Sequence, residues 1–507
     1  MSGLAVVMGN SDMDTCKTML GRINHRGPDI AGFAEVGNAV IGQNYLPADV
    51  HAVYDRQAVP VMAAQPTLKI IGYDGQIGNR SEMARRFNIE GGAFQEERLL
   101  LNLYEHYGAK MMDHLQDAIF AFVIVDEQNG LFAARDLLGI KTLYYAKQNG
   151  TIYLGSEIKA VLAAAGEVHE FPAGHYMNAD GELVAFDALS DQPPETIHSS
   201  EVDSIRIIRD IIENSIDSRI DFKFKTGSLL SGGIDSSVIA MLANKRHKNL
   251  FGSTARLDTF ALGVGVSEDI VNARLVANAI DSRHHEKIVD LQTILDVLDD
   301  VIYHLESFDP SLVRSAVANY LISRFAAEHG IEVLLSGEGG DEVFCGYMYL
   351  KQESPGALLK GQIDCLKFLH SNASLRLDHM NQCNQVRVVA PLISAPLLQY
   401  ALALAPELKQ KPKGDQKIEK YIFRKAFEND LPAEVVWRLK QEFSQGSGSA
   451  ALLPGHFEQI VSDKDLAEIQ EAFPVVRSKE EMFYFNLFTK HFGSGSAVDT
   501  VGQWITL

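Results

Sequence analysis

The sequence predicts two domains of different fold class: a layered α+β domain with largely antiparallel strands, then an α/β domain with a doubly wound parallel sheet and a helical final part. Three observations predict them. Short β-branched and aromatic runs dominate the first third of the chain. Strands alternate with helices from residue 204 onward, and the last third is mostly helical. The expected domains are residues 1–190 and 204–507.

The first domain contains runs with strand composition, separated by Gly, Asn and Asp turns. They cover residues 5–9, 38–42, 68–75, 119–126, 130–136, 142–147 and 151–156. Residues 96–108 carry apolar side chains at helical spacing and predict a helix. The acidic, proline-containing stretch Leu189–Asp203 is expected to be a linker or domain edge.

The second domain has the alternating pattern of a parallel sheet with crossover helices. Strands are predicted at 228–230, 259–264, 285–289 and 332–335. Helices are predicted at 204–214, 236–246, 270–280 and 314–329, with a further helical stretch that reaches Glu306. Because parallel strands end at one edge of a sheet, polar residues that follow these strands are expected to share a crevice.

The chain has 507 residues, with Lys+Arg 46 and Asp+Glu 66, so its net charge is −20. This balance argues against a nucleic-acid surface, which needs clustered Lys and Arg. The sequence contains no run of about 18 apolar residues, which is the length that a membrane-spanning helix needs, so no such helix is predicted. The amino terminus lacks the basic flank of a signal peptide. Four cysteines without metal-ligand spacing predict reduced thiols and a cytoplasmic protein.

The most specific local pattern follows the strand predicted at 228–230 and opens the next helix. It reads Ser231-Gly232-Gly233-Ile234-Asp235-Ser236-Ser237. The glycines let the backbone approach a phosphate, the helix start adds its positive end, and the hydroxyls add donors. Asp235 is expected to hold Mg²⁺ there. The alternative is an ordinary Ser/Gly turn that caps a helix. The pattern at residues 231–237 is not a Walker loop, because a Walker loop needs Gly-Lys-Ser/Thr.

A second polar cluster follows the strand predicted at 332–335. It reads Ser336-Gly337-Glu338-Gly339-Gly340-Asp341-Glu342 and is followed by Tyr347. Its three carboxylates would repel one another without a cation among them. Next to a phosphate loop, Mg²⁺ is the expected ion. The alternative is a solvated acidic turn.

Basic residues form a third cluster late in the chain. They are Lys417, Lys420, Arg424, Arg438 and Lys440, the last directly before the Gly/Ser-containing stretch 441–448. In an acidic chain this pattern suits polyphosphate binding and stabilisation of transition-state charge. Alone it would predict only a solvated helix face, and it gains weight from the other two clusters.

Together these residues resemble the class II, glutamine-dependent asparagine synthetase family over roughly residues 1–450. In the second domain the motifs that carry the resemblance are SGGIDSS (231–237), DTFALGVG (258–265), HHE (284–286), YHLESFDPSLVRSAVANYLISR (303–324), SGEGGDEVFCGY (336–347), EKYIFR (419–424) and WRLKQEFSQGSG (437–448). In the first domain they are HRGPD (25–29), FAARDLLGIKTLYY (132–145), GSEIKA (155–160) and PAGH (172–175).

The resemblance implies an αββα domain of the N-terminal-nucleophile type ahead of a synthetase domain of the N-type ATP pyrophosphatase class. In that family ATP adenylates a carboxylate, diphosphate leaves, and an amine attacks the acyl-adenylate. The residues implied to bind diphosphate are Ser231, Gly232, Gly233, Asp235, Ser236 and Ser237, and those implied to bind adenosine are Leu230, Leu262, Ser336 and Gly337. Asp235 and Asp341 are implied to hold Mg²⁺. Lys440, Lys420 and Arg324 are implied to offset the negative charge of the departing diphosphate, and Glu338 to face the attacking amine.

The first domain departs from the family's glutaminase motifs at four places. The family begins Met-Cys-Gly, whereas this chain begins Met1-Ser2-Gly3. The oxyanion-hole Asn is Asp74, whose carboxylate would repel an oxyanion. The Asp that holds the glutamine amine is Gln95, and no arginine lies between Arg26 and Arg56. We therefore expect that this domain does not hydrolyse glutamine.

The second domain departs from the family in one stretch that forms the substrate wall. The family's Arg-Val-Pro-Phe-Leu-Asp appears within residues 387–394, where Arg387 is displaced relative to Pro391 and Ser394 replaces the Asp. The phosphate and metal residues are retained. An altered carboxylate substrate is therefore expected, with the ATP chemistry kept.

The leading prediction is an ATP-dependent amide synthetase resembling the β-lactam synthetases, in which the substrate's own amine closes a ring. Those enzymes have a Tyr–Glu pair that is not visible here, so Glu338, alone or with Tyr347, is the expected base. The alternatives are an ammonia-dependent, asparagine synthetase-like ligase and an idle nucleotide-binding regulatory subunit. The expected partner is a small amino-acid-like carboxylate, without nucleic acid or membrane, and a homodimer is left open.

Overall fold

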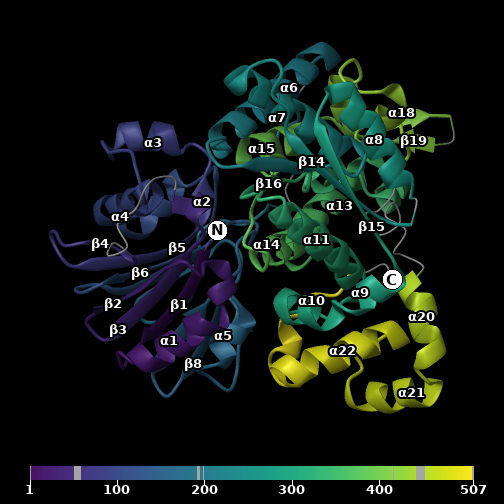
Figure 1. Ribbon diagram of the computed structural model, residues 1–507. Coiled ribbons are helices and arrows are strands. Elements are labelled where there is room, and N and C mark those ends of the chain that lie inside the picture. The colour runs from purple at the N-terminus through teal and green to yellow at the C-terminus, as the bar shows by residue number, and fades with distance from the viewer. Residues whose placement is uncertain are drawn as a thin grey trace. The chain divides into compact units, whose positions relative to one another are not determined.

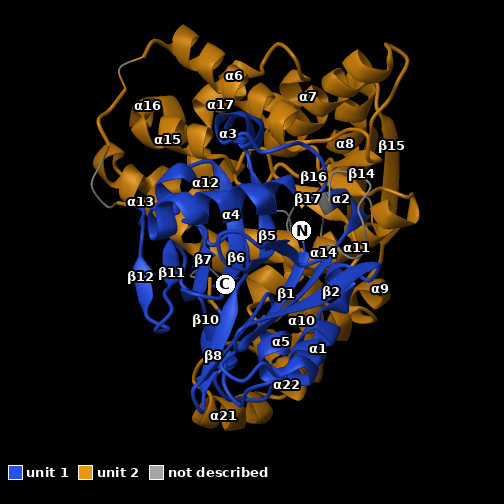
Figure 2. Cartoon of the chain, turned by 90° about the vertical axis from the view of Figure 1, so that its left-hand side faces the viewer, with its two compact units in different colours: residues 1–189, 492–501 blue, residues 190–491, 502–507 orange. Residues whose placement is uncertain are grey.

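The structure is a computed structural model that describes residues 2–50, 59–190, 194–197, 199–265, 267–414, 416–440 and 452–504. It divides into two compact units (Figure 2). Unit 1 is residues 1–189 with 492–501, and unit 2 is residues 190–491 with 502–507. The second domain was expected to run unbroken to residue 507. Residues 492–501 belong to unit 1 instead, where the Ser496 hydroxyl accepts a hydrogen bond from the Val168 amide (2.8 Å).

Unit 1 contains two six-stranded sheets whose pairings are antiparallel. The first has the order β10 (His169–Glu170), β8 (Tyr144–Gln148), β9 (Thr151–Gly155), β1 (Ser2–Met8), β3 (Ala39–Tyr45) and β2 (Ile30–Val36). The second has the order β12 (Leu183–Ala185), β11 (His175–Met177), β7 (Gly130–Arg135), β6 (Ala118–Asp126), β5 (Lys69–Ile77) and β4 (Val61–Ala63).

Three apolar layers hold unit 1 together. Leu4, Ile41 and Val123 belong to a cluster that joins the inner faces of the two sheets. The outer face of the first sheet packs on α1 (Met13–Arg22) and α5 (Ile158–Leu162). The outer face of the second packs on α4 (Gln95–Tyr107), near α3 (Arg80–Arg86) (Figure 1). The predicted α+β domain with antiparallel strands is confirmed, and its layers follow the order αββα.

Unit 2 is built on a five-stranded sheet in which every pairing is parallel. Its order is β15 (Arg283–Val289), β14 (Asp258–Val264), β13 (Thr226–Leu229), β16 (Val333–Leu335) and β17 (Arg387–Val389). The predicted parallel sheet is confirmed. Of the strands in this sheet, only β17 was not predicted, because residues 387–394 were interpreted as the substrate wall and not as a strand.

Helices flank this sheet and fill the rest of unit 2 (Figure 1). They include α6 (Glu201–Arg219), α7 (Ile234–Phe251), α8 (Glu268–Ile280), α10 (Leu298–Leu305), α11 (Pro310–Glu328), α12 (Gly340–Phe344), α13 (Pro355–Phe368), α14 (Ala373–Gln382), α15 (Ala395–Ala403), α17 (Tyr421–Ala426), α18 (Ala433–Val436), α20 (Leu452–Ile460), α21 (Asp463–Ala472) and α22 (Lys479–Phe492). Helix α6 begins inside the stretch expected to be a linker, because the Ser200 hydroxyl caps it by accepting from Asp203 N.

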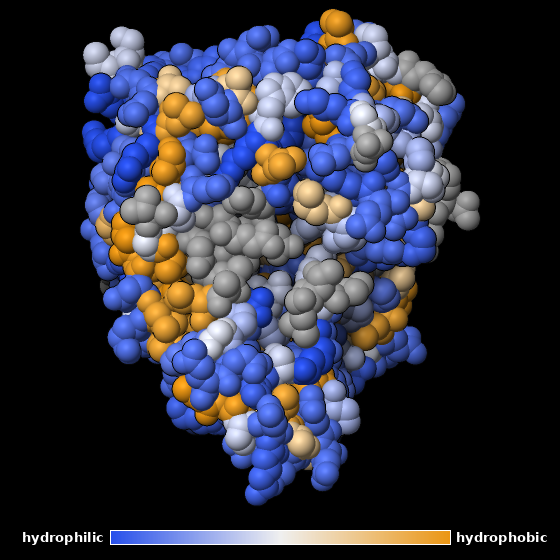
Figure 3. All heavy atoms as spheres, turned by 90° about the vertical axis from the view of Figure 1, so that its right-hand side faces the viewer, coloured by the Kyte–Doolittle hydropathy of each residue, from blue (hydrophilic) through white to orange (hydrophobic). Residues whose placement is uncertain are grey.

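Within the described ranges, no helix is both long and apolar enough to cross a membrane. Figure 3 shows a face on which hydrophilic side chains predominate and hydrophobic ones gather in small groups.

Candidate active site

A cavity of about 210 Å³ lies at the carboxyl ends of β13, β14 and β16 in unit 2. This is the edge where a doubly wound sheet is expected to bind its ligand. The predicted site residues that line the cavity are Leu230, Ser231, Gly233, Asp235, Ser236, Leu262, Ser336, Gly337, Glu338, Asp341, Tyr347 and Lys440. The structure therefore brings together residues from all three sequence clusters.

The predicted phosphate loop turns sharply between β13 and α7. Gly232 has φ +73°, and a Cβ there would lie 2.6 Å from Ala273 N, so the turn requires glycine. The hydroxyls of Ser231 and Ser236 lie 3.0 Å apart and face the cavity. Ser237 does not: its hydroxyl donates to Gly233 O (2.7 Å) within the helix, and the residue is buried.

The two strand-end loops touch at Gly337. A Cβ on this residue would lie 2.5 Å from Ser236 N, at the start of α7. The acidic loop after β16 therefore packs directly on the phosphate loop after β13. This contact places Asp341 of the second loop near Asp235 of the first.

Lys420 lies between these two carboxylates. Its Nζ is 2.5 Å from Asp235 Oδ2 and 2.7 Å from Asp341 Oδ1, and its side chain is fully buried. The residue precedes α17 with φ +53°, a left-handed conformation that is unfavourable for a lysine. Lys420 thus contacts the phosphate site through its acidic residues and does not itself line the cavity.

Lys440 is the second ammonium group at this site, 2.6 Å from Asp341 Oδ2. Burial alone would raise the pKa of Asp341, but Lys420 and Lys440 outweigh it and hold that pKa well below its usual range. Burial alone would lower the pKa of Lys440, but Asp341 and Asp235 raise it above its usual range. Both groups are charged at neutral pH. The Gly/Ser stretch 441–448, predicted to complete this cluster, lies outside the described residues.

The carboxylates fit the predicted magnesium ion. Asp235 Oδ1 is buried without a hydrogen-bond partner, and it lies beside the oxygens of Asp341 that bind the lysines. Among the described residues, no group of three or more His, Cys, Asp or Glu side chains could hold a metal by itself. This donor set suits Mg²⁺, which in nucleotide sites is bound by one or two carboxylates together with substrate phosphates.

Arg324, expected to offset the charge of diphosphate, does not reach the cavity. Helix α11 lines the cavity through Ser311, Ser315, Asn319 and Ile322, which share one face. At 100° per residue, Arg324 lies on the opposite face, and its guanidinium stacks 5.2 Å from the centre of the Tyr320 ring. The structure therefore does not bring Arg324 to the cavity, and its role at the diphosphate stays a prediction.

The remaining basic residues are bound by protein groups. Lys417 Nζ donates to the Glu353 carbonyl (2.5 Å). Arg424 and Arg438 line the cavity, but they pair with Glu419 (2.5 Å) and Asp269 (2.9 Å). Lys420 and Lys440 differ from these residues because their partners are the carboxylates of the predicted phosphate site itself, Asp235 and Asp341.

The lining of the cavity also contains an ion pair that the sequence did not indicate. Nη2 of Arg376, on α14, lies 2.5 Å from Oε2 of Glu338. Arg387, expected near the substrate wall, is the first residue of β17 and is paired with Val333, away from the carboxyl end of its strand. Arg376 thus supplies a guanidinium to the cavity where Arg387 does not. Nothing in the sequence distinguished it from other helical arginines.

Glu342 is the second residue whose role was missed, although it stands in the predicted acidic cluster. Burial, with Asp341 and Glu338 nearby, raises its pKa to about 7. Its Oε1 accepts a hydrogen bond from the Tyr347 hydroxyl (2.6 Å). Its Oε2 is buried without a hydrogen-bond partner. Tyr347 lines the cavity, so the pair connects a buried carboxyl group to the site.

Unit 1 has a buried ionic network around Asp74, the residue at the expected oxyanion-hole position. Asp74 Oδ2 lies 3.0 Å from Arg26 and its Oδ1 lies 3.2 Å from Lys141, and all three side chains are buried. Ser2 N donates to Asp74 Oδ1 (3.1 Å), and the Ser2 hydroxyl donates to Tyr73 O (2.5 Å). Arg26 also binds Glu157 (2.7 Å). Gln95 is the first residue of α4, and Arg56 lies outside the described residues.

The fold and the site define an ATP-using synthetase domain joined to a glutamine amidotransferase-type domain. Two family models match the chain accordingly. Residues 1–190 match the glutamine amidotransferase domain, and residues 207–364 and 351–498 match asparagine synthase.

The similarity to known proteins covers nearly the whole chain. Asparagine synthetase B [glutamine-hydrolyzing] of Escherichia coli (strain K12) is 34% identical over 94% of this chain and 88% of that protein. Asparagine synthetase [glutamine-hydrolyzing] 1 of Arabidopsis thaliana is 31% identical over 99% and 88%. The asparagine synthetase [glutamine-hydrolyzing] of Rattus norvegicus is 30% identical over 97% and 94%. The chain belongs to the asparagine synthase family, whose members are ATP-dependent amide ligases.

Proposed function

We propose that this protein uses ATP and Mg²⁺ to adenylate the carboxylate of a small amino-acid-like substrate and joins the acyl group to an amine that does not come from glutamine. In the leading form of the proposal the amine belongs to the same molecule, as in the β-lactam synthetases. The observation that carries the proposal is the double pairing of Lys420 with Asp235 and Asp341, beside a cavity whose lining includes the Arg376–Glu338 pair.

In the first step a substrate carboxylate oxygen attacks the α-phosphorus of ATP, the bond to the β-phosphate breaks, and diphosphate leaves. The turn at Gly232 and the N-terminus of α7 offer backbone N–H groups to the phosphates. Lys440 and Lys420 offset the charge on the leaving group. Mg²⁺, held by Asp235 and Asp341, supplies further positive charge to the phosphate oxygens when bound.

In the second step the amine attacks the acyl carbon, a carbon–nitrogen bond forms, and AMP leaves with the oxygen. The amine must lose a proton to a nearby base. Glu338 lines the cavity and is the first candidate, but its carboxylate is paired with Arg376. Glu342, with a pKa of about 7, is placed to accept the proton through the Tyr347 hydroxyl, which would pass its own proton to Glu342.

The proposal that glutamine is not the amine source rests on Asp74. The Asp74 carboxylate lies in a buried network with Arg26 and Lys141, at the position where the family has a donor to the oxyanion. A carboxylate at that position repels an oxyanion. The relatives are named as glutamine-hydrolyzing, so this is a specific departure from them.

The test is diphosphate release by the full chain with ATP and Mg²⁺. Aspartate, glutamate and longer amino-bearing dicarboxylates are offered alone, with ammonium chloride and with glutamine. Turnover without ammonium, with a product lighter than its substrate by one water, supports ring closure. Turnover stimulated by glutamine, with release of glutamate, would overturn the proposal for unit 1.

A second function is favoured by the retained Glu338 and by the names of the relatives. It is an ammonia-dependent, asparagine synthetase-like amide ligase. A strict requirement for ammonium in the same assay would select it over ring closure. An idle nucleotide-binding subunit is the remaining alternative, and any diphosphate release would exclude it. In each case we propose small molecules as the partners, without nucleic acid or membrane, and a homodimer as the assembly to be tested.

A further inference from the structure

Residues 502–504 return to unit 2 and place an indole in the wall of the active-site cavity. The main chain of Trp504 is fixed on both sides. Its N–H donates to Asp309 Oδ2 (3.0 Å), and its carbonyl accepts from Arg477 Nη1 (3.0 Å). The Gln503 side chain donates to Val475 O (2.7 Å). Trp504 is therefore built into the wall.

The groups that hold Trp504 are themselves anchored. Asp309 is 1% exposed, and its other oxygen caps α11 by accepting from Leu312 N (3.0 Å). Arg477 binds Asp309 (2.9 Å) and Glu481 (2.8 Å). One carboxylate thus positions both Trp504 and the helix whose Ser311 face lines the same cavity.

The indole lies beside Tyr347, one of the residues to which the amine chemistry is assigned in the proposed function. Its ring centre lies 5.6 Å from that of Tyr347 and 5.3 Å from that of Phe368. The Tyr347 hydroxyl binds Glu342, and Glu338 lines the same cavity. Aromatic faces and carboxylates both attract cations. Glu338 already has Arg376 as its counter-charge, so the difference lies at Glu342. An alkyl group would gain from the rings alone, whereas an ammonium would also be attracted by the Glu342 carboxyl group that binds Tyr347.

From this arrangement we infer that Trp504 and Tyr347 form a binding wall for a cationic amine carried by the carboxylate substrate, with Trp504 as a specificity-determining residue. The inference rests on the proposed function, because it assigns a substrate class to the same cavity. That class is a carboxylic acid that bears an aliphatic ammonium group. The ammonium rests against the rings until it loses its proton.

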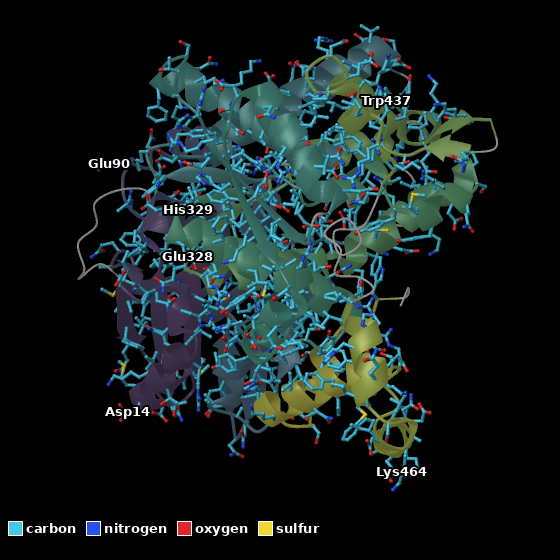
Figure 4. The ribbon with its side chains drawn as sticks, turned by 45° about the vertical axis from the view of Figure 1, so that its right-hand side comes forward. Asp14, Glu90, Glu328, His329, Trp437 and Lys464 are labelled. Atoms are coloured by element: carbon cyan, nitrogen blue, oxygen red, sulfur yellow. The ribbon has the colours of Figure 1, made fainter. Side chains whose placement is uncertain are left out.

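The chain offers a direct optical test, because it contains two tryptophans. Trp437, labelled in Figure 4, follows α18 and is 39% exposed. In the full-length Trp437→Phe variant, Trp504 is the sole indole. Its emission is titrated with 6-aminohexanoate and 5-aminopentanoate and with the matched acids that lack the amine, hexanoate and pentanoate, each with a non-hydrolysable ATP analogue. A Trp437→Phe/Trp504→Phe double variant gives the background.

We expect saturable changes in Trp504 emission with the two amino-bearing acids, at concentrations at least tenfold below any response to the matched acids without an amine. Equal responses within each pair would reduce the wall to an apolar contact and overturn the inference. Absence of any response would overturn it as well. Ammonium chloride alone, if it saturates the signal, would show that the wall takes free ammonium and not a substrate-borne amine.

Kinetics separate this inference from the proposed function. Trp504→Leu should raise the KM of the active amino-bearing carboxylate by about 2- to 30-fold, which is the range of a cation–π contact, with the KM of ATP unchanged. Trp504→Phe should recover most of that loss. If the parent enzyme releases no diphosphate with any substrate, the proposed function fails, while the emission titration still decides whether Trp504 contacts an amine.

Discussion

Gly346 and Lys420 are so close that a methyl group on Gly346 would lie 2.0 Å from Cε of Lys420. The same methyl group would lie 2.1 Å from Asp341 Oδ1. Only a glycine lets the lysine side chain pass this point and reach Asp235 and Asp341. The pairing at the phosphate site thus depends on a residue that binds nothing itself.

Gly346→Ala should therefore impair the enzyme by displacing Lys420. We expect diphosphate release to fall at least tenfold and the free energy of unfolding to fall by about 1–3 kcal/mol, the usual cost of overpacking. Initial rates and urea unfolding measure the two effects. Gly356→Ala is the matched control, because nothing lies within 4 Å of its added methyl group and it stands in α13. An unchanged rate in Gly346→Ala would show that Lys420 has room elsewhere.

Lys440→Gln should reduce kcat for diphosphate release by about 10²–10³, because it removes one positioned charge from the leaving group. The KM of the carboxylate substrate should change little, since Lys440 contacts Asp341. Steady-state kinetics provide the measurement, with exposed Lys464→Gln (labelled in Figure 4) as the control. A fall below threefold would argue that the phosphates do not lie beside Lys440.

Glu342→Gln should alter the pH dependence of the free energy of unfolding and the pH dependence of kcat. The pKa of Glu342 rises from 4.5 to about 7 on folding, so the folded state favours the protonated form. Its contribution to stability is fully present below pH 4.5 and is lost as the pH rises through about 7. The unfolding free energy of the parent should therefore fall relative to Glu342→Gln across this window.

Activity should show the opposite slope. If Glu342 accepts the amine proton through Tyr347, kcat of the parent rises with pH through about 7, and Glu342→Gln loses this limb of the profile. A profile that keeps the limb in the variant would assign the base to Glu338.

Asp74→Asn should destabilise the protein without creating glutaminase activity. The change leaves Arg26 and Lys141 buried with less counter-charge, and breaking a buried pair costs about 3–5 kcal/mol. Denaturant unfolding of the full chain measures the loss. Asp14→Asn, at an exposed pair with Lys17, should change stability by less than about 0.5 kcal/mol. Glutamate release from glutamine by the parent would contradict the role given to Asp74.

Most of the fold, and the residues expected to bind the phosphates of ATP, could be predicted from the sequence. Ser231, Asp235 and Ser336 sit in compact motifs at strand ends, where chain order alone places them at one edge of the sheet. Strand β2 was missed because Ala31 and Gly32 weaken its strand composition. Strand β17 was missed because its residues were interpreted as part of the substrate wall.

The amine half of the site depends on tertiary contacts that sequence does not show. Arg376 is one arginine in a helix, and only the fold brings it to Glu338. Trp504 follows Val501 of unit 1 in the chain, yet its indole lines the unit 2 cavity. Arg324 is the converse case: it stands in a family motif, yet its helix turns it away from the cavity and toward Tyr320.

The two carboxylates that hold Lys420 and Lys440 also bear on how a catalytic cycle ends. Both ammonium groups have anionic protein partners within 2.7 Å. A departing diphosphate must compete with these tethered anions, which are always at high local concentration. The enzyme thereby carries an internal competitor for its own product. Product escape should be fast, and inhibition by added diphosphate should be weak as long as Asp235 and Asp341 are intact.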